Sequence, residues 1–327
     1  MKKSRAYVLL AALVVFICIC TASLTEGRLP LKREALTLQN DNLRAMRIEL
    51  TAEEIAQYAD ECNLPVGEYL CTLMAAENWT ADVQTAQSLT PRQAVALRNR
   101  LVRHYPEEFY KMSSLYAGLV ADMQCFPIPV SKGNEQMWVE YCDSWGLERT
   151  YGGERRHEGT DIMAQNNTPG IYPVLSATAG TVTNIGWLEL GGWRIGITSE
   201  NGIYYYYAHL RQNRPYAEGL KEGDAVTAGD VIGYMGHTGY SDTENVNNIK
   251  TVHLHAGLQL IFDESQKECD NEIWIDFYQL ARFLHAHRSK VVRDDATKEW
   301  KRQYKMRDPE VEAYEKSMSN SISEHPE

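Results

Sequence analysis

The chain has 327 residues, of which 44% are hydrophobic and 24% charged, an ordinary composition for a globular protein that is long enough to hold two modest domains. Its formal net charge is −11 and its pI is near 5.4. Because binding to phosphate groups needs a clustered basic surface, this balance argues against a nucleic acid partner.

The first segment, residues 1–27, has the layout of an export signal. Three basic residues precede an apolar run at 6–22, which is nearly long enough to span a bilayer. We interpret it as an uncleaved membrane anchor, with a signal peptide cleaved after the small residues at 20–22 as the alternative. Because the basic residues stay on the cytoplasmic side, the sequence predicts that the rest of the chain is extracytoplasmic, either anchored to the cell membrane or secreted.

A polar linker at 28–50 precedes a predicted helical domain at 51–124. Thr51 begins a capping box, and Thr90-Pro91 is an N-cap followed by proline at the first helical position. Apolar residues recur at helical spacing after each of these signals. The sequence leaves open whether this domain covers a groove, binds a partner or spaces the chain from the membrane.

Two prolines in "CFPIPVS" (125–131) end the helical region, because proline cannot continue a helix. Short β-rich runs follow, and Asn201-Gly202 between two of them predicts a tight hairpin. We therefore predict a mainly antiparallel β domain at 125–287 and an α+β chain as a whole. The segment 288–327 alternates in charge and predicts a solvated helix that fades into a disordered tail.

Histidines occur in three short motifs of the predicted β domain. "RRHEGTDIMA" carries His157 and Asp161 on a loop that enters a strand, and "YYYYAHL" places His209 at the end of another. "TVHLHAGLQL" puts His253 and His255 on one face of a strand, because strand side chains alternate between faces. Two neutral imidazoles and one carboxylate suit a catalytic zinc, with the fourth tetrahedral position left to water. Two histidines are then left over.

These motifs resemble those of the lysostaphin-type, or LytM-type, zinc endopeptidases, which cut peptide bonds in bacterial peptidoglycan. The family's H-x-G-x-D and H-x-H are both present, as His157, Gly159 and Asp161 and as His253 and His255. Between them "YYAHL" is similar to the family's Y-x-H-L, and "LKEGDAVTAGDVIGYMGHTGYS" to its glycine-rich stretch. The likeness covers roughly 127–262. It implies a LytM-type catalytic domain of the duplicated hybrid motif type.

Carried over position by position, the resemblance implies that His157, Asp161 and His255 bind Zn²⁺. It also implies that His209 and His253 are catalytic residues beside the metal. Zinc acidifies its bound water and polarises the scissile carbonyl, while a histidine that is not a ligand can move protons or stabilise the oxyanion. Which histidine has which role stays open. The implied function is a zinc-dependent hydrolysis of peptidoglycan peptides.

Three departures from the family pattern concern substrate preference more than metal binding. Ala256 stands where family members usually have an aromatic residue, and the segment at 242–252 is longer than usual. The customary Asn-Pro at the end of the domain is replaced by "NEIWIDFYQLARFL", which predicts a strand running into a helix. The cross-bridge or stem-peptide bond that is cut therefore stays open.

Three other functions compete with this interpretation. A catalytically inactive envelope scaffold, or an activator of another wall hydrolase, typically lacks a metal ligand, and here none is lost. A sugar-cleaving enzyme would use Glu77 as its acid, but the accompanying motifs are absent. A cupin-type metal protein also uses H-x-H, but no glutamate follows His255 at the usual distance.

Three further features are interpreted as structural. Glu158 lies between two candidate ligands, but on a strand it would face away from His157. The tyrosines at 204–207 alternate between faces, so half of them could line a groove, although ordinary strand packing explains them equally well. Five cysteines lie beyond the apolar run without a C-x-x-C motif, which argues against a thiolate zinc site.

Overall fold

The computed structural model describes these stretches of the chain: 45–76, 79–131, 137–262, 266–267, 272–276, 278–286 and 288–303. The predicted signal segment at 1–27 and the candidate acid Glu77 lie outside them. Within the described stretches, no helix combines the length and the apolar character that a membrane span needs.

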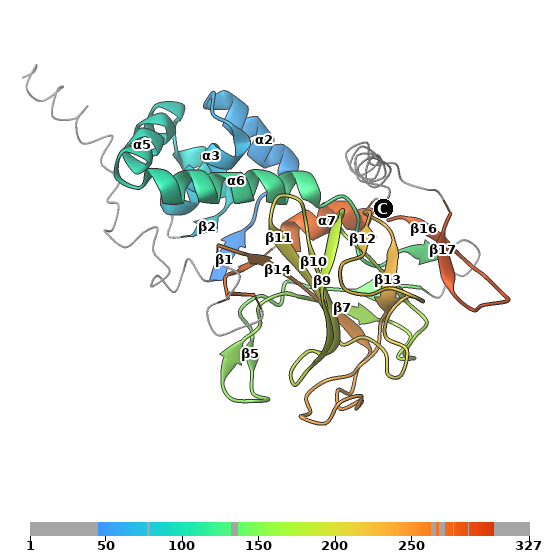
Figure 1. The fold of residues 1–327 in the computed structure, drawn as a ribbon. Helices are drawn as coiled ribbons and strands as arrows, with labels where there is room; N and C mark the ends of the chain where they lie inside the picture. The colour runs from blue at the N-terminus through green and yellow to red at the C-terminus, as the bar shows by residue number, and fades with distance from the viewer. Residues whose placement is uncertain are drawn as a thin grey trace, which may run out of the picture.

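The helices that precede the β domain form one layer, at the top of Figure 1. They are α2 (Ala52–Glu61), α3 (Val66–Ala76), α4 (Val83–Ser88), α5 (Pro91–His104) and α6 (Pro106–Asp122). Thr51 caps α2 through reciprocal hydrogen bonds with Glu54, at 2.8 and 3.2 Å. Thr90 caps α5 with Gln93 in the same way. The predicted helical region is therefore confirmed, and α4 is a helix that the sequence did not predict.

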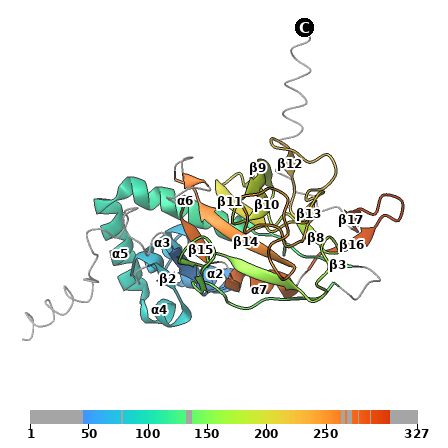
Figure 2. The same ribbon diagram turned by 90° about the horizontal axis from the view of Figure 1, so that it is seen from below.

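The largest sheet has the strand order β12-β9-β10-β11-β14-β15-β1-β2, with β7 pairing with both β14 and β4. Its strands are β1 (Ala45–Ile48), β2 (Thr80–Ala81), β4 (Val139–Glu140), β7 (Thr160–Ala164), β9 (Gly180–Leu188), β10 (Gly192–Thr198), β11 (Ile203–Ala208), β12 (Ala225–Val226), β14 (His253–Leu260) and β15 (Trp274–Asp276). Seen from below, β14 crosses the middle of the molecule (Figure 2). Apart from the parallel pairs of β1, these strands are antiparallel, so the predicted mainly antiparallel β domain is confirmed.

The predicted hairpin at Asn201-Gly202 joins β10 to β11. Gly202 has φ +80°, a conformation that glycine adopts without strain. Asn201 donates from Nδ2 to Asp122 Oδ1 at 2.6 Å, and a Cβ at Gly118 of α6 would lie 2.4 Å from the Asn201 Cβ. The absence of a side chain at Gly118 therefore lets the helical layer touch the sheet at this turn.

Smaller strand groups complete the fold. They are β5 (Glu148–Arg149) with β6 (Arg155–Arg156), β8 (Pro173–Leu175) with β13 (Val231–Tyr234), and β3 (Val130–Ser131) with β16 (Lys290–Arg293) and β17 (Trp300–Arg302). Helix α7 (Tyr278–Ala286) follows β15, as the strand-then-helix pattern predicts.

Strands β1, β2, β16 and β17 lie where the sequence predicts no strand, and β2 falls inside the predicted helical domain. β1 falls within the predicted linker and runs parallel to β15 on one side and β2 on the other. The solvated helix predicted for the charged segment is wrong for 290–302, where β16 and β17 pair and bury Val291 and Trp300. β1 and β16 each pair with a strand that is distant in sequence, β15 and β3 respectively, so local patterns did not indicate them. The domain boundaries themselves stay predictions.

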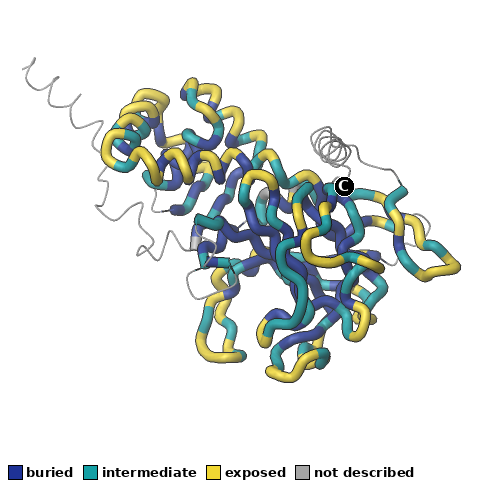
Figure 3. The backbone as a smooth tube through the Cα atoms, in the orientation of Figure 1, coloured by how far each residue is buried: buried dark blue, intermediate teal, exposed yellow. Residues whose placement is uncertain are grey.

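The hydrophobic core is continuous from the helical layer into the sheet, and burial is concentrated along the central strands (Figure 3). The tyrosines at 204–207 are all buried. Tyr205 and Tyr207 join this core, whereas Tyr204 and Tyr206 pack with Trp274 in a smaller cluster on the other face of β11. Both faces of β11 are therefore covered.

Candidate metal centre

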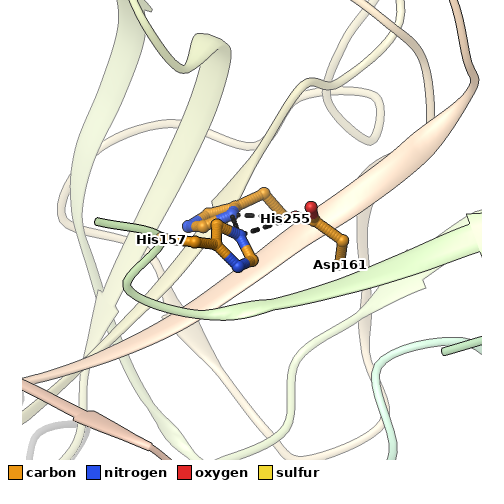
Figure 4. A group of neighbouring side chains, drawn as sticks. All are labelled: His157, Asp161 and His255. Carbon is orange, nitrogen blue, oxygen red and sulfur yellow. Dashed lines mark hydrogen bonds and ion pairs between the residues drawn. The ribbon is translucent and has the colours of Figure 1, made fainter. Parts of the chain in front are cut away.

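Strands β7 and β14 bring two of the predicted metal ligands together. Asp161 of β7 lies directly opposite His255 of β14 in the antiparallel register, so their side chains leave the same face. His157 precedes β7 by three residues and reaches the same point (Figure 4). Its Nε2 lies 3.0 Å from Asp161 Oδ1 and 3.0 Å from His255 Nδ1, and the last two atoms are 3.1 Å apart.

This triangle of donor atoms fits a zinc ion. Two nitrogens and one carboxylate oxygen bound at the usual zinc distances of a tetrahedron would be separated by about 3.3 Å, close to the 3.0 to 3.1 Å found here. Three protein ligands leave one position open, which is the arrangement of catalytic rather than structural zinc sites. In the part of the chain that the structure describes, these residues form the one group found with metal-binding geometry.

The protonation states of the triangle also suit a metal. Burial tends to raise the pKa of Asp161, but hydrogen bonds with His157 and His255 outweigh it and hold the pKa well below the usual range. Asp161 is therefore ionised. Burial lowers the pKa of His255 despite its contact with Asp161, which favours the neutral imidazole that binds metals.

Neighbouring groups orient each ligand. His157 Nδ1 donates to the Ser144 carbonyl oxygen at 2.9 Å, which leaves the Nε2 lone pair facing the triangle. Arg149 Nη2 donates to Asp161 Oδ2 at 2.8 Å, so Oδ1 is the oxygen turned to the imidazoles. A Cβ at Gly159 would lie 2.7 Å from the His255 ring. The glycine of the H-x-G-x-D motif is therefore required for close packing.

The two other predicted site residues lie beside the triangle. His253 Nε2 is 3.9 Å from Asp161 Oδ1, and the His209 ring centre is 4.7 Å from that of His253. His209 Nδ1 donates to the Thr238 carbonyl oxygen and His253 Nδ1 to that of Thr251, both at 2.9 Å. In the neutral rings, Nε2 then carries the free lone pair. Their catalytic roles stay predictions.

Burial acts strongly on His209. Removal from water lowers the pKa of His209 well below its ordinary value, and the neighbouring histidines add to the effect. Its backbone has φ +60°, an uncommon conformation for a residue other than glycine. Backbone hydrogen bonds to Gly191 and from Gly236, at 2.8 and 3.0 Å, hold this conformation. A neutral, rigidly placed imidazole results.

A cavity of about 420 Å³ contains all five predicted site residues. Tyr206, one of the tyrosines that the alternation allows to face a groove, also lines it, as do residues that the sequence reasoning did not single out, namely Arg149, Arg155, Arg156, Tyr240 and Trp274. Glu158, interpreted from sequence as structural, lines it as well. The run of arginines just before the H-x-G-x-D motif is a signal that could have been noticed, whereas the aromatic residues come from distant strands and loops.

The remaining histidines of the described residues do not join the triangle. His237 Nδ1 donates to the Ile249 carbonyl oxygen, and His285 packs edge-on against Phe126 and Tyr141. Four cysteines, Cys62, Cys71, Cys125 and Cys142, are free thiols. None of these groups lines the cavity.

Comparison with known proteins identifies the family. The model of Peptidase family M23 matches residues 155–269. The crystal structure of a candidate glycyl-glycine endopeptidase, LytM, from Ruminococcus gnavus ATCC 29149 aligns over 80% of this chain and 97% of that one, with 36% identity and a TM-score of 0.56. The chain belongs to peptidase family M23. Because 80% of the chain is aligned, the likeness of this M23 family member to the R. gnavus protein extends beyond the matched domain.

Curated relatives of the M23 domain include the L-Ala–D-Glu endopeptidase of Bacillus subtilis (strain 168), which is 38% identical over 151 residues. Lysostaphin of Staphylococcus simulans is 32% identical over 93 residues. These matches cover 46% and 28% of this chain, and 42% and 17% of the relatives. The chain thus spans less than half of the length of each.

Proposed function

We propose that this M23 peptidase is a zinc-dependent endopeptidase that hydrolyses peptide bonds of bacterial peptidoglycan. The observation that carries the proposal is the convergence of His157, Asp161 and His255 with two further histidines on one cavity. The name of one relative, an L-Ala–D-Glu endopeptidase, supports a peptide bond as the target, and the resemblance of the motifs to peptidoglycan endopeptidases supports peptidoglycan as the polymer.

The proposed division of labour follows from the contacts of the histidines. His157, Asp161 and His255 would hold the zinc, which when bound supplies a Lewis acid for the scissile carbonyl and acidifies water. We assign to His253, whose Nε2 lies 3.9 Å from Asp161 Oδ1, the role of accepting the proton of the attacking water. We assign to His209, adjacent to it, the transfer of that proton from His253 to the leaving amine, and a hydrogen bond to the oxyanion while His209 carries the proton.

Digestion of purified peptidoglycan by the zinc-loaded full chain tests the proposal. We expect new amino groups from stem peptides or cross-bridges and no new reducing sugar ends, because the proposed metal-assisted attack breaks an amide and leaves glycosidic bonds intact. Sugar ends without new amines would contradict an endopeptidase. If a folded chain with one equivalent of zinc released neither product, the inactive scaffold or activator would replace the enzyme as the proposed function.

We also propose that the chain is held in the cell membrane by residues 1–27, with the peptidase domain outside the cytoplasm. The support is the basic and apolar pattern of that segment and the extracytoplasmic location of the proposed substrate. Protease added to cells stripped of their wall should digest the peptidase domain while the cells stay intact. Full protection of that domain would contradict this topology, and its release into the medium would indicate the secreted form.

A further inference from the structure

Strands β5 and β6 form one wall of the cavity and carry two arginines directly opposite each other. Arg149 of β5 pairs with Arg155 of β6 in the antiparallel register, and both side chains line the cavity. The hairpin projects from the body of the molecule in Figure 1. Like charges placed directly opposite in a sheet destabilise it, so each guanidinium needs a compensating anion.

Only one of the two arginines has an anion among the described residues. Arg149 pairs with Asp161, with Nη2 at 2.8 Å from Oδ2. Arg155 Nη2 instead donates to the neutral Tyr240 hydroxyl at 3.3 Å, and no ion pair joins Arg155 to a carboxylate in that part of the chain. Its Nε is buried and has no hydrogen-bond partner there. A buried guanidinium nitrogen without an acceptor is costly unless a ligand supplies one.

Aromatic contacts hold Arg155 in place. The carbon atom of its guanidinium lies 5.9 Å from the centre of the Tyr240 ring, within the range of a cation–π contact. Tyr240 stacks on Tyr151, with ring centres 4.5 Å apart and planes 8° apart. On the other side, the Tyr240 ring meets His209 edge-on at 5.9 Å. One aromatic ring therefore separates the guanidinium from a predicted catalytic histidine.

No other charged group of the cavity forms an ion pair with Arg155 in the described residues. Three glutamates line it, Glu158, Glu189 and Glu272, of which Glu272 accepts a hydrogen bond from Trp274 Nε1 at 2.8 Å. Arg156 is also present, but it lies directly opposite Glu148 in the strand register, where opposite charges are favourable. Among the arginines of this wall, Arg155 is the one with a buried nitrogen that lacks a partner in the described residues and with an aromatic contact that fixes its guanidinium.

We propose that Arg155 determines substrate specificity by binding a free carboxylate of the peptide close to the amide that is cut. The planar guanidinium matches a carboxylate with two parallel hydrogen bonds, which lysine or a neutral side chain cannot reproduce. The enzyme then prefers an acidic stem peptide, such as one with a free glutamyl carboxylate, to a neutral glycine bridge. This inference rests on the proposed function for the identity of the polymer.

A matched pair of peptides tests the inference. Both contain an L-Ala–D-Glu bond, and they differ only in a free glutamyl carboxylate or the corresponding carboxamide. Binding to the zinc-free full chain, measured by calorimetry, separates recognition from cleavage. We expect the acid to bind about 10- to 100-fold more tightly, as is typical for a hydrogen-bonded charged group. In the zinc-loaded enzyme, the preference should appear in KM rather than kcat.

Two substitutions localise the effect. Arg155→Gln should reduce the ratio of the acid affinity to the carboxamide affinity to about one, while the carboxamide affinity stays unchanged. Arg155→Lys should keep only part of the wild-type ratio. Arg92→Gln on the exposed surface of α5 removes the same charge far from the wall and should keep the full ratio. Thermal unfolding and zinc content establish that each variant is folded.

Two outcomes would overturn the inference: equal binding of acid and carboxamide by the wild-type chain, or an unchanged ratio in folded Arg155→Gln. The wild-type comparison needs no variant, so it can refute the inference even if Arg155→Gln does not fold. A preference for the acid in binding, together with no cleavage of peptidoglycan by the zinc-loaded chain, would refute the proposed enzyme and leave the carboxylate site standing.

Discussion

Asp161 is the residue on which the metal centre depends most. Its Oδ1 faces His157 and His255 at 3.0 and 3.1 Å, while its Oδ2 receives the Arg149 guanidinium at 2.8 Å. The carboxylate is thus fixed from both sides before any metal binds. Partners that orient a ligand commonly contribute 10- to 100-fold to metal affinity.

Replacement of Arg149 by glutamine should therefore weaken zinc binding by about 10- to 100-fold, because Asp161 would lose the contact that turns Oδ1 to the imidazoles. Titration against a competing chelator measures the dissociation constant. Arg155→Gln is the matched control, since Arg155 lies on the same wall but makes no contact with Asp161 in the described residues. Equal zinc affinities of wild type and Arg149→Gln would show that Arg149 does not position the ligand.

His253 and His255 form a matched pair on one face of β14, two residues apart. His255→Ala should remove nearly all of the zinc, because one corner of the ligand triangle is lost. His253→Ala should retain about one equivalent of zinc and lose about 100-fold or more in kcat, the usual effect of removing a general acid or base. Metal analysis and turnover of both variants check this. A full equivalent of zinc in His255→Ala would remove His255 from the ligand set.

Asp276 on β15 predicts a pH-dependent contribution to stability. Burial raises the pKa of Asp276 to about 6, outweighing the Tyr278 N–H that donates to its Oδ1 and the Arg47 Nε at 3.2 Å from its Oδ2. Since this exceeds the unfolded value of about 3.9, the folded chain holds the proton more tightly. Protonated Asp276 stabilises the folded chain fully below about pH 4. This contribution to the free energy of unfolding is lost as the pH rises through about 6, and the total loss is about 3 kcal/mol.

The free energy of unfolding of Asp276→Asn, measured relative to wild type, should therefore increase from pH 4 to pH 7 by up to about 3 kcal/mol, because only the wild type loses the protonated side chain. Denaturant unfolding of both proteins at the two pH values measures the change. Effects of the substitution that do not depend on pH cancel in this difference. If the difference between the proteins were the same at pH 4 and pH 7, the raised pKa would be wrong.

At the scale of elements, β1 joins the helical layer to the peptidase sheet. It lies between β15 and β2, and Met46 and Ile48 are fully buried. Arg47 between them forms ion pairs with Asp143 and Asp276. Without β1, the backbone of β15 would present an open edge, which favours association with other chains.

A fragment that begins at residue 126 should therefore unfold at a lower temperature than one that begins at residue 45, and it should associate in solution. Size-exclusion chromatography with light scattering and thermal unfolding compare the two. Ile48→Ala in the longer fragment isolates the packing of β1 and should cost roughly 2 to 5 kcal/mol. Equal stability and a monomeric state for both fragments would show that the peptidase domain is independent of β1.

At the scale of the whole molecule, the helical layer and the site are separate. The cavity is lined by residues between Arg149 and Trp274, and none of its described lining residues comes from α2 to α6. In the described structure, the layer does not cover the groove. The segments around the helices contact the sheet instead, because β1 and β2 extend it beyond β15 and α6 touches the β10–β11 turn.

Zinc should stabilise the whole peptidase domain, because its ligands come from β14 and from the segment that enters β7. A metal that binds only the folded chain adds about 2.7 kcal/mol at 100 times its dissociation constant. Thermal unfolding with zinc and with a chelator should therefore differ by several degrees. His255→Ala is the control and should show no zinc-dependent shift. If the wild-type Tm were the same with zinc and with a chelator, a metal site that forms only on folding would be contradicted.

The sequence by itself determined the features that depend on neighbouring residues. Capping threonines and prolines start the helices, and Asn201-Gly202 turns the β10–β11 hairpin, because these signals act over a few residues. The alternation of a strand placed His253 and His255 on one face, and the resemblance of the motifs pointed to the M23 family. No distant partner is needed for any of these conclusions.

Only the tertiary structure decided the features that join segments far apart in the chain. β1 pairs with β15 across more than 200 residues, and β16 pairs with β3 across about 160. The contacts of Arg149 with Asp161 and of Arg155 with Tyr240 likewise depend on how β5 and β6 are set against the sheet. Strands of two to four residues and single polar contacts carry no periodic signal, because a long-range partner supplies their stability.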